Sequence, residues 1–155
     1  MLAGLYQFEM ILNTSRAPRI YPHEVQSEEP ALLGDRESYF NRLELGFERR
    51  IERLSASFAS LSAMSLSAKA AWKNGVYESL QDLQFLKDEY EEYVRLKLLC
   101  VDPCESDDVK LDRCNEMAMK RDVFKRYLGF KDEFGAELES VVKRIEVLLN
   151  QNLVK

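Results

Sequence analysis

The spacing of apolar residues between positions 40 and 61 restricts the fold of this chain more than any other feature of its sequence. Successive apolar side chains there follow at steps of three or four residues: Phe40, Leu43, Phe47, Ile51, Leu54, Phe58 and Leu61. Such steps place the side chains along one face of an α-helix. Asp35 can cap the start of this helix, and Asn74-Gly75 can end it. The spacing therefore predicts a helix over residues 36–73.

A second apolar stripe, from Val76 to Leu98, predicts a helix over residues 76–100. Asp102-Pro103 follows this stripe and ends the helix, because proline cannot continue the backbone hydrogen bonds. Only a few residues join this helix to its neighbours on either side. Short connections of this kind indicate antiparallel neighbours.

A third stripe, from Leu111 to Leu148, predicts one long helix over residues 108–150. Gly129 and Gly135 lie within it, and each costs about 1 kcal/mol relative to alanine in a helix interior. The stripe keeps its phase across both glycines, which favours a single helix; the alternative is two helices that separate at Gly129. Together the three stripes predict an all-α fold, an antiparallel bundle of three long helices.

The first 35 residues follow a different pattern. Residues 1–13 carry a partial apolar stripe, which predicts a short helix or strand. Three of the four prolines follow: Pro18, Pro22 and Pro30. Because proline biases the preceding residue toward extended geometry, residues 15–26 are expected to form an extended arm, and a short helical turn can start at Ser27. The chain thus divides into an N-terminal anchoring segment, 1–35, and a helical bundle domain, 36–155.

A single histidine, His23, is present among the 155 residues, and this count removes most catalytic and metal-binding arrangements. Di-iron bundles need a histidine on each of two helices, and zinc sites of the His-Glu-x-x-His type need two histidines. Glycine-rich loops that bind phosphate are absent from the sequence. We therefore expect a protein that is not an enzyme, with no cofactor, no metal and no small-molecule substrate.

The charge balance and the hydropathy pattern restrict the partners. The 22 basic and 27 acidic residues give a net charge of −5, which disfavours nucleic acid. One alternative is that the protein has an accessory role in a nucleic-acid complex and binds through a basic patch of Arg49, Arg50 and Arg53 on the first long helix. Membrane spans need ~18 consecutive apolar residues, and no stretch approaches that length. The apolar N-terminus has no basic leader, so no signal peptide is expected, and the expected compartment is the cytoplasm or the nucleus.

The cysteines at positions 100, 104 and 114 have the spacing C-x3-C-x9-C. In a reducing compartment they are expected to be ordinary thiols, with Cys114 on the apolar stripe of the third helix. Cys100 and Cys104, near a helix end, are the candidate redox residues, either as free thiols or as a pair.

The functional prediction is based on the unequal lengths of the three predicted helices. A short middle helix leaves apolar ends of the first and third helices uncovered, and large exposed apolar patches mark interaction sites. We predict a non-catalytic helical protein–protein interaction module, a subunit or adaptor of a larger homo- or hetero-assembly that binds through apolar helix faces. The candidate interaction residues are Phe40, Phe47, Arg49, Arg50, Arg53, Phe134, Ile145 and Leu148.

The alternative from a different class is a small-ligand-binding or catalytic bundle. It needs a pocket between the helices, lined by carboxylates and by the tyrosines Tyr77, Tyr90, Tyr93 and Tyr127. A fully packed core between the helices would argue against this alternative.

Overall fold

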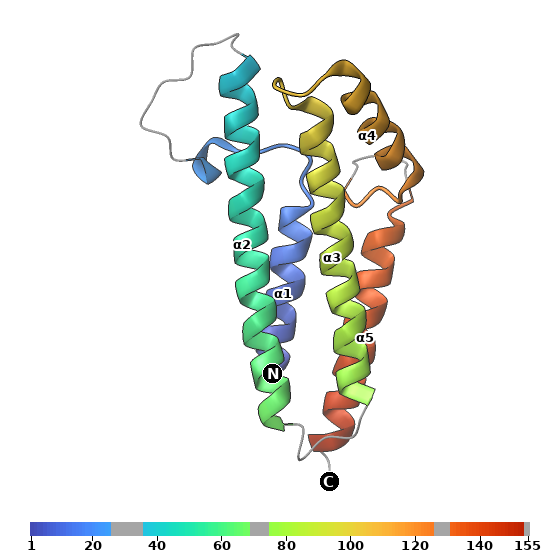
Figure 1. Ribbon diagram of the computed structural model, residues 1–155. Coiled ribbons are helices and arrows are strands. Elements are labelled where there is room, and N and C mark those ends of the chain that lie inside the picture. Colours follow the sequence, from blue (N-terminus) through green and yellow to red (C-terminus); the bar gives the residue numbers. More distant parts are fainter. Residues whose placement is uncertain (26–35, 69–74, 126–130, 154–155) are drawn as a thin grey trace.

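The computed structural model describes residues 1–25, 36–68, 75–125 and 131–153, and all regular structure within these ranges is helical. The helices are α1 (Leu2–Ser15), η1 (a short 3-10 helix, Pro22–Glu24), α2 (Arg36–Ala68), α3 (Gly75–Val101), α4 (Asp107–Met119) and α5 (Glu133–Leu153). In Figure 1, α1, α2, α3 and α5 stand side by side, and each runs antiparallel to its neighbours. The prediction of an all-α helical bundle is confirmed.

One hydrophobic core runs through the bundle and draws on α1, α2, α3 and α5. α1 contributes Leu5, Phe8 and Leu12, which are completely buried and spaced by three and four residues. The bundle therefore has four long members where the sequence predicted three. The partial stripe of residues 1–13 is enough to make α1 a helix, because its three large apolar side chains all face the other helices.

The helices predicted over 36–73 and 76–100 agree with α2 and α3. α3 extends one residue beyond the predicted range at each end, from Gly75 to Val101. α2 begins at Arg36 and ends at Ala68, and positions 69–73 of the predicted helix lie outside the described residues. The helical turn expected after Ser27 also lies outside them.

The single helix predicted over 108–150 is wrong. α4 ends at Met119 and α5 begins at Glu133, with non-helical backbone at 120–125 and 131–132. Gly129, the break that the alternative named, falls among residues that the structure does not describe. α4 lies against the C-terminal half of α3, beside the end of the bundle where α2 begins (Figure 1).

Arg16 supplies the physical reason for this break. Its guanidinium is buried, and Nε donates a hydrogen bond of 2.7 Å to the carbonyl oxygen of Val123. The N–H of Lys125 donates in return to the carbonyl oxygen of Arg16 at 2.9 Å, and Arg16 also pairs with Asp132. The carboxylate of Asp132 accepts from the N–H of Gly135 at 2.9 Å, which caps the start of α5. These contacts need a non-helical backbone between α4 and α5.

Candidate partner-binding groove

The residues after α1 cross over the N-terminal half of α2 and form what we call the arm, residues 16–25. Gly46 of α2 allows the arm to come this close. A Cβ atom at position 46 would lie 2.4 Å from Cγ2 of Ile20, too near for any real contact. The absence of a side chain at Gly46 therefore sets how near Ile20 can lie to α2.

Arg50 of α2 fixes the arm in place, and its guanidinium is 1% exposed. Both carboxylate oxygens of Glu24 accept hydrogen bonds from it at 2.7 Å. The remaining donors reach backbone carbonyl oxygens on the arm and at the end of α1: Ser15 at 3.1 Å, Ala17 at 2.6 Å and Arg19 at 2.6 Å. A planar guanidinium with fixed donor directions suits such a fork of acceptors.

Glu24 is the acidic centre of the same network. Arg49 donates to its backbone carbonyl oxygen at 2.6 Å, and a nitrogen of Arg53 lies 3.6 Å from its carboxylate. Burial acts to raise the pKa of Glu24, but the hydrogen bonds from Arg50 and from the N–H of Tyr21 outweigh burial. The pKa of Glu24 therefore lies below its usual value, and the carboxylate stays ionised.

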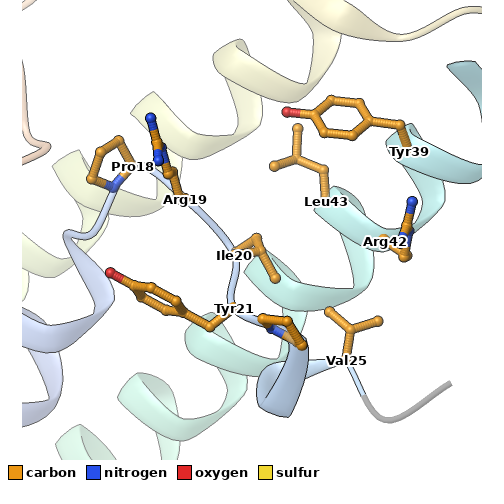
Figure 2. A pocket seen from close by; sticks show the side chains of 9 residues that line it. Pro18, Arg19, Ile20, Tyr21, Val25, Tyr39, Arg42 and Leu43 are labelled. Atoms are coloured by element: carbon orange, nitrogen blue, oxygen red, sulfur yellow. The ribbon is translucent and has the colours of Figure 1, made fainter. Parts of the chain in front are cut away.

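Between the arm and the start of α2 lies an open groove of about 740 Å³. We call it the arm groove, and its lining residues are Pro18, Arg19, Ile20, Tyr21, Pro22, Val25, Tyr39, Arg42 and Leu43. Figure 2 shows Pro18, Arg19 and Tyr21 of the arm on one side, Tyr39, Arg42 and Leu43 of α2 on the other, and Ile20 of the arm between them. Tyr21 is 46% exposed and Tyr39 is 61% exposed, so two aromatic side chains stand at its rim.

The charge of the arm groove is positive. Arg19 and Arg42 line it, and no carboxylate is among its described lining residues. The nearby carboxylate of Glu24 is occupied by Arg50 and Arg53. The arm groove therefore combines an aliphatic floor, two phenol rings and two guanidinium groups, which is a setting for an anionic group attached to an apolar one.

The predicted interaction residues do not gather on one surface. Phe47, Phe134 and Ile145 are completely buried in the core, and Arg50 is buried beneath the arm, so these four have no surface for a partner. These four residues lie on an apolar stripe or next to one, and the stripes face other helices of the same bundle. Leu148 is partly buried and packs against the core.

Three predicted interaction residues on α2 keep some exposure. Arg53 is 61% exposed, while Phe40 and Arg49 are partly buried. Phe40 is in the first turns of α2, close in sequence to Tyr39 and Arg42, but is not part of the groove lining. The predicted residues thus include neighbours of the arm groove on α2 but none of the arm residues that form its other wall. The signal for that wall was present in the proline-rich arm, which alternates apolar, basic and aromatic residues from Pro18 to Pro22.

The tyrosines named for the ligand-binding alternative do not line a shared pocket. Tyr90 and Tyr93 belong to the core, and the hydroxyl of Tyr90 donates to the carbonyl oxygen of Ser15 at 2.8 Å. Tyr77 is 48% exposed on α3, and Tyr127 lies outside the described residues. Burial raises the pKa of Tyr90 so far that its hydroxyl stays protonated, as a hydrogen-bond donor must.

The cysteines are placed differently from the predicted pair. Cys100, in the last turn of α3, has Cys114 of α4 as a neighbour that raises its pKa, and both residues are partly buried. Cys104 is exposed in the turn between these helices. The thiol that lies next to Cys100 is therefore that of Cys114.

Within 1–25, 36–68, 75–125 and 131–153, no group of three or more His, Cys, Asp or Glu side chains is placed to hold a metal ion. None of the helices in that part of the chain has the length and apolar character needed to cross a membrane. Comparison of this chain with protein-family models, with curated proteins and with solved structures gives no significant match.

Proposed function

We propose that this protein is a non-catalytic interaction module that binds an acidic segment of a partner protein in the arm groove. The observation that carries the proposal is the pairing of Arg19 and Arg42 with two exposed tyrosines around an open groove that has no carboxylate among its described lining residues. The protein is then a subunit or adaptor of a larger assembly, and the expected compartment is the cytoplasm or the nucleus.

The rigidity of the groove walls supports this role. One wall is helix α2, and the other is tied to it through Arg50 and its hydrogen bonds to Glu24, Ala17 and Arg19. A binding surface that is already ordered loses less conformational entropy when a partner binds. The arm therefore serves as a preformed wall of the site.

The side chains at the rim are of the types that contribute most to protein interfaces. Tyrosine and arginine are enriched among residues whose truncation costs the most binding energy. A guanidinium also forms paired hydrogen bonds with a carboxylate, and such charge-assisted bonds are shorter and stronger than neutral ones. An apolar partner side chain over Ile20 and Leu43, flanked by carboxylates near Arg19 and Arg42, would use all these features.

The test is a selection from random displayed peptides on the full chain, followed by titration of the enriched peptides. We expect them to carry Asp or Glu beside Phe, Tyr or Leu. Arg42→Ala should weaken their binding by about tenfold or more, the loss of a charge-assisted hydrogen bond. Salt near 1 M, where charges are screened beyond about 3 Å, should weaken it too. Arg95→Ala, which removes an exposed arginine of α3 outside the groove, is the matched control and should bind as the unaltered chain does.

Other outcomes of the same selection would overturn the proposal. Enriched peptides without acidic residues, or peptides that bind Arg42→Ala and Arg19→Ala unchanged, would remove the arm groove as the site. A dimer in solution that the Arg19→Ala, Arg42→Ala double variant converts to a monomer would show that the groove is occupied by a second copy of the chain.

The size of the groove favours one second candidate, a small anionic ligand. Sites for small molecules have volumes of roughly 300–1,000 Å³, and the arm groove falls in this range. Small aromatic carboxylates and phosphates can be tested by thermal shift on the same variants. A ligand that raises the Tm of the unaltered chain but not of the double variant, in the absence of any enriched acidic peptide, would favour this candidate.

A further inference from the structure

The interface between α3 and α4 brings together two thiols that no part of the proposed function uses. Cys114 and Met117 are one turn apart on α4, and Met117 packs against the core, so Cys114 lies on the α4 face that meets α3. On α3, Cys100 follows Leu96 by one turn, and Leu96 is 1% exposed. The effect of Cys114 on the pKa of Cys100 agrees with both placements.

We propose that Cys100 and Cys114 form a redox site that reacts with a small-molecule disulfide and closes into a disulfide bond between α3 and α4. The inference is independent of the arm groove. It differs from the pairing of Cys100 with Cys104 that the sequence spacing suggested, because the exposed Cys104 lies in the turn and the partner of Cys100 comes from the next helix.

The two sulfur atoms take different roles in the reaction. Burial, and then the neighbouring Cys114 thiol, raise the pKa of Cys100 to about 12. The thiolate is the nucleophile in disulfide exchange, and a raised pKa keeps Cys100 protonated, so we assign Cys100 the second attack.

The Cys114 thiolate bonds to one sulfur of the small disulfide, and the other half leaves as a thiolate that takes up a proton. Cys100 then loses its proton and attacks the Cys114 sulfur of the mixed disulfide, and the second half leaves as a thiol. In total, one small disulfide is reduced to two thiols, and the two cysteines lose two hydrogen atoms as their disulfide bond forms.

The bond would hold an element that otherwise has few anchors. No residue of α4 is fully buried, and among the described helices its main contacts are with α3, while Met117 packs against the core. Helices with so little buried surface open locally at low free energy. A bond between Cys100 and Cys114 would close the chain between them into a short loop and keep α4 on α3.

The test treats the folded full chain with oxidised glutathione and maps its disulfides by mass spectrometry after digestion without reduction. We expect a product lighter than the starting chain by two hydrogen atoms, with Cys100 linked to Cys114. Cys104→Ser is the matched control and should give the same product, whereas Cys114→Ser and Cys100→Ser should each give none. Amide protons of α4 should exchange at least about tenfold more slowly in the oxidised chain.

Three results would overturn the proposal. A bond from Cys104 to either of the other cysteines would show that the turn, and not the helix interface, controls pairing. Glutathione attached to Cys104 alone, with Cys100 and Cys114 still reduced, would show that the buried pair does not react. A Cys100–Cys114 bond that leaves the exchange of α4 amides unchanged would show that it does not hold the helix.

Discussion

At the scale of single residues, two buried arginines organise the end of the bundle where α1 finishes. Arg50 and Arg16 are each 1% exposed, and each pairs with a carboxylate and donates to at least one backbone carbonyl oxygen. Their guanidinium groups also have aromatic neighbours: the guanidinium carbon of Arg50 lies 5.3 Å from the ring centre of Phe47, and that of Arg16 lies 5.0 Å from the ring centre of Phe134. Sequence reasoning placed Arg50 in an outward patch with Arg49 and Arg53, because an arginine beside an apolar stripe is normally exposed.

Replacement of Arg50 tests whether this buried arginine holds the arm on the bundle. In Arg50→Ala, the carboxylate of Glu24 and three backbone carbonyl oxygens lose their hydrogen bonds from the guanidinium, and breaking a buried ion pair on one side costs about 3–5 kcal/mol. We expect the free energy of unfolding, measured by urea denaturation, to fall by an amount of that order. Arg50→Lys should recover only part of the loss, since a single ammonium cannot reproduce the fork.

Arg53→Ala is the matched control for Arg50. Its side chain is 61% exposed and lies 3.6 Å from the same carboxylate. An exposed ion pair contributes about 0–1 kcal/mol, so its removal should have a small effect. Equal losses in Arg50→Ala and Arg53→Ala would contradict the assignment of Arg50 as the residue that holds the arm.

At the scale of elements, sequence periodicity predicts a helix correctly where residues nearby in the chain determine its ends. α3 was predicted to within one residue at each end, because a continuous apolar stripe ends at a proline. The region after Met119 was predicted as helix because Phe124 and Phe134 fit the phase of the stripe. Both side chains do reach the core, but Phe124 does so from non-helical backbone, which a long-range contact with Arg16 supports. A partner more than one hundred residues away in the chain leaves no trace in local spacing.

The candidate site was harder to predict than the fold for the same reason. Tyr39, Arg42 and Leu43 stand on a helix that the sequence shows clearly, whereas Arg19 and Tyr21 face them only because the arm crosses α2. That crossing depends on Gly46 and on the network around Arg50, both of which are contacts between segments distant in sequence. The sequence indicates a proline-rich arm without indicating the surface it lies on.

The carboxylates of Glu24 and Asp132 hold the arm and the connection between α4 and α5 in place. Their pKa values predict how the stability of the fold depends on pH. Burial acts to raise the pKa of Asp132, but the hydrogen bonds from Arg16 and from the N–H of Gly135 outweigh it, so the pKa lies below its usual value, as it does for Glu24. A carboxyl group with a lowered pKa in the folded state stabilises the fold above its unfolded pKa, about 4.3 for glutamate. This stabilisation is lost as the pH falls through the folded pKa.

We therefore expect the free energy of unfolding to decrease as the pH is lowered from 5 toward 3, a range of about two units around the carboxyl pKa values. Glu24→Gln should be less stable near neutral pH and should show a shallower decrease, since one of the titrating groups is gone. Urea denaturation at a series of pH values measures both. Glu48→Gln, at an exposed position of α2, is the matched control, and a Glu24→Gln profile as steep as that of this control would contradict the role of Glu24.

At the scale of the whole molecule, α1 completes the bundle. Its apolar face lies in the same core as the faces of α2, α3 and α5, and Phe8 packs against Phe58 of α2 with ring centres 5.6 Å apart. The first helix and the last are also in contact. A chain that shares one core across its length is expected to unfold in a single cooperative step.

Phe8→Ala tests this cooperativity. Removal of a fully buried phenylalanine costs about 3–5 kcal/mol, and in a single cooperative unit the loss lowers the Tm of every helix together. Circular dichroism follows the whole molecule, and hydrogen exchange follows each helix separately. Gln7→Ala, at an exposed position of α1, is the control. A Phe8→Ala chain in which α3 and α5 keep their full protection would show that α1 is only an attached segment.

The contacts of Arg16 have a consequence for how the protein is made. Ribosomes add about 5–20 residues per second, so on the order of ten seconds separates the synthesis of Arg16 from that of Asp132. For most of that interval Val123 has not been made, and α5, which shares a core with Leu5, Phe8 and Leu12, is made only after it. Until α5 is made, the apolar face of α1 that contacts α5 is therefore exposed on the nascent chain.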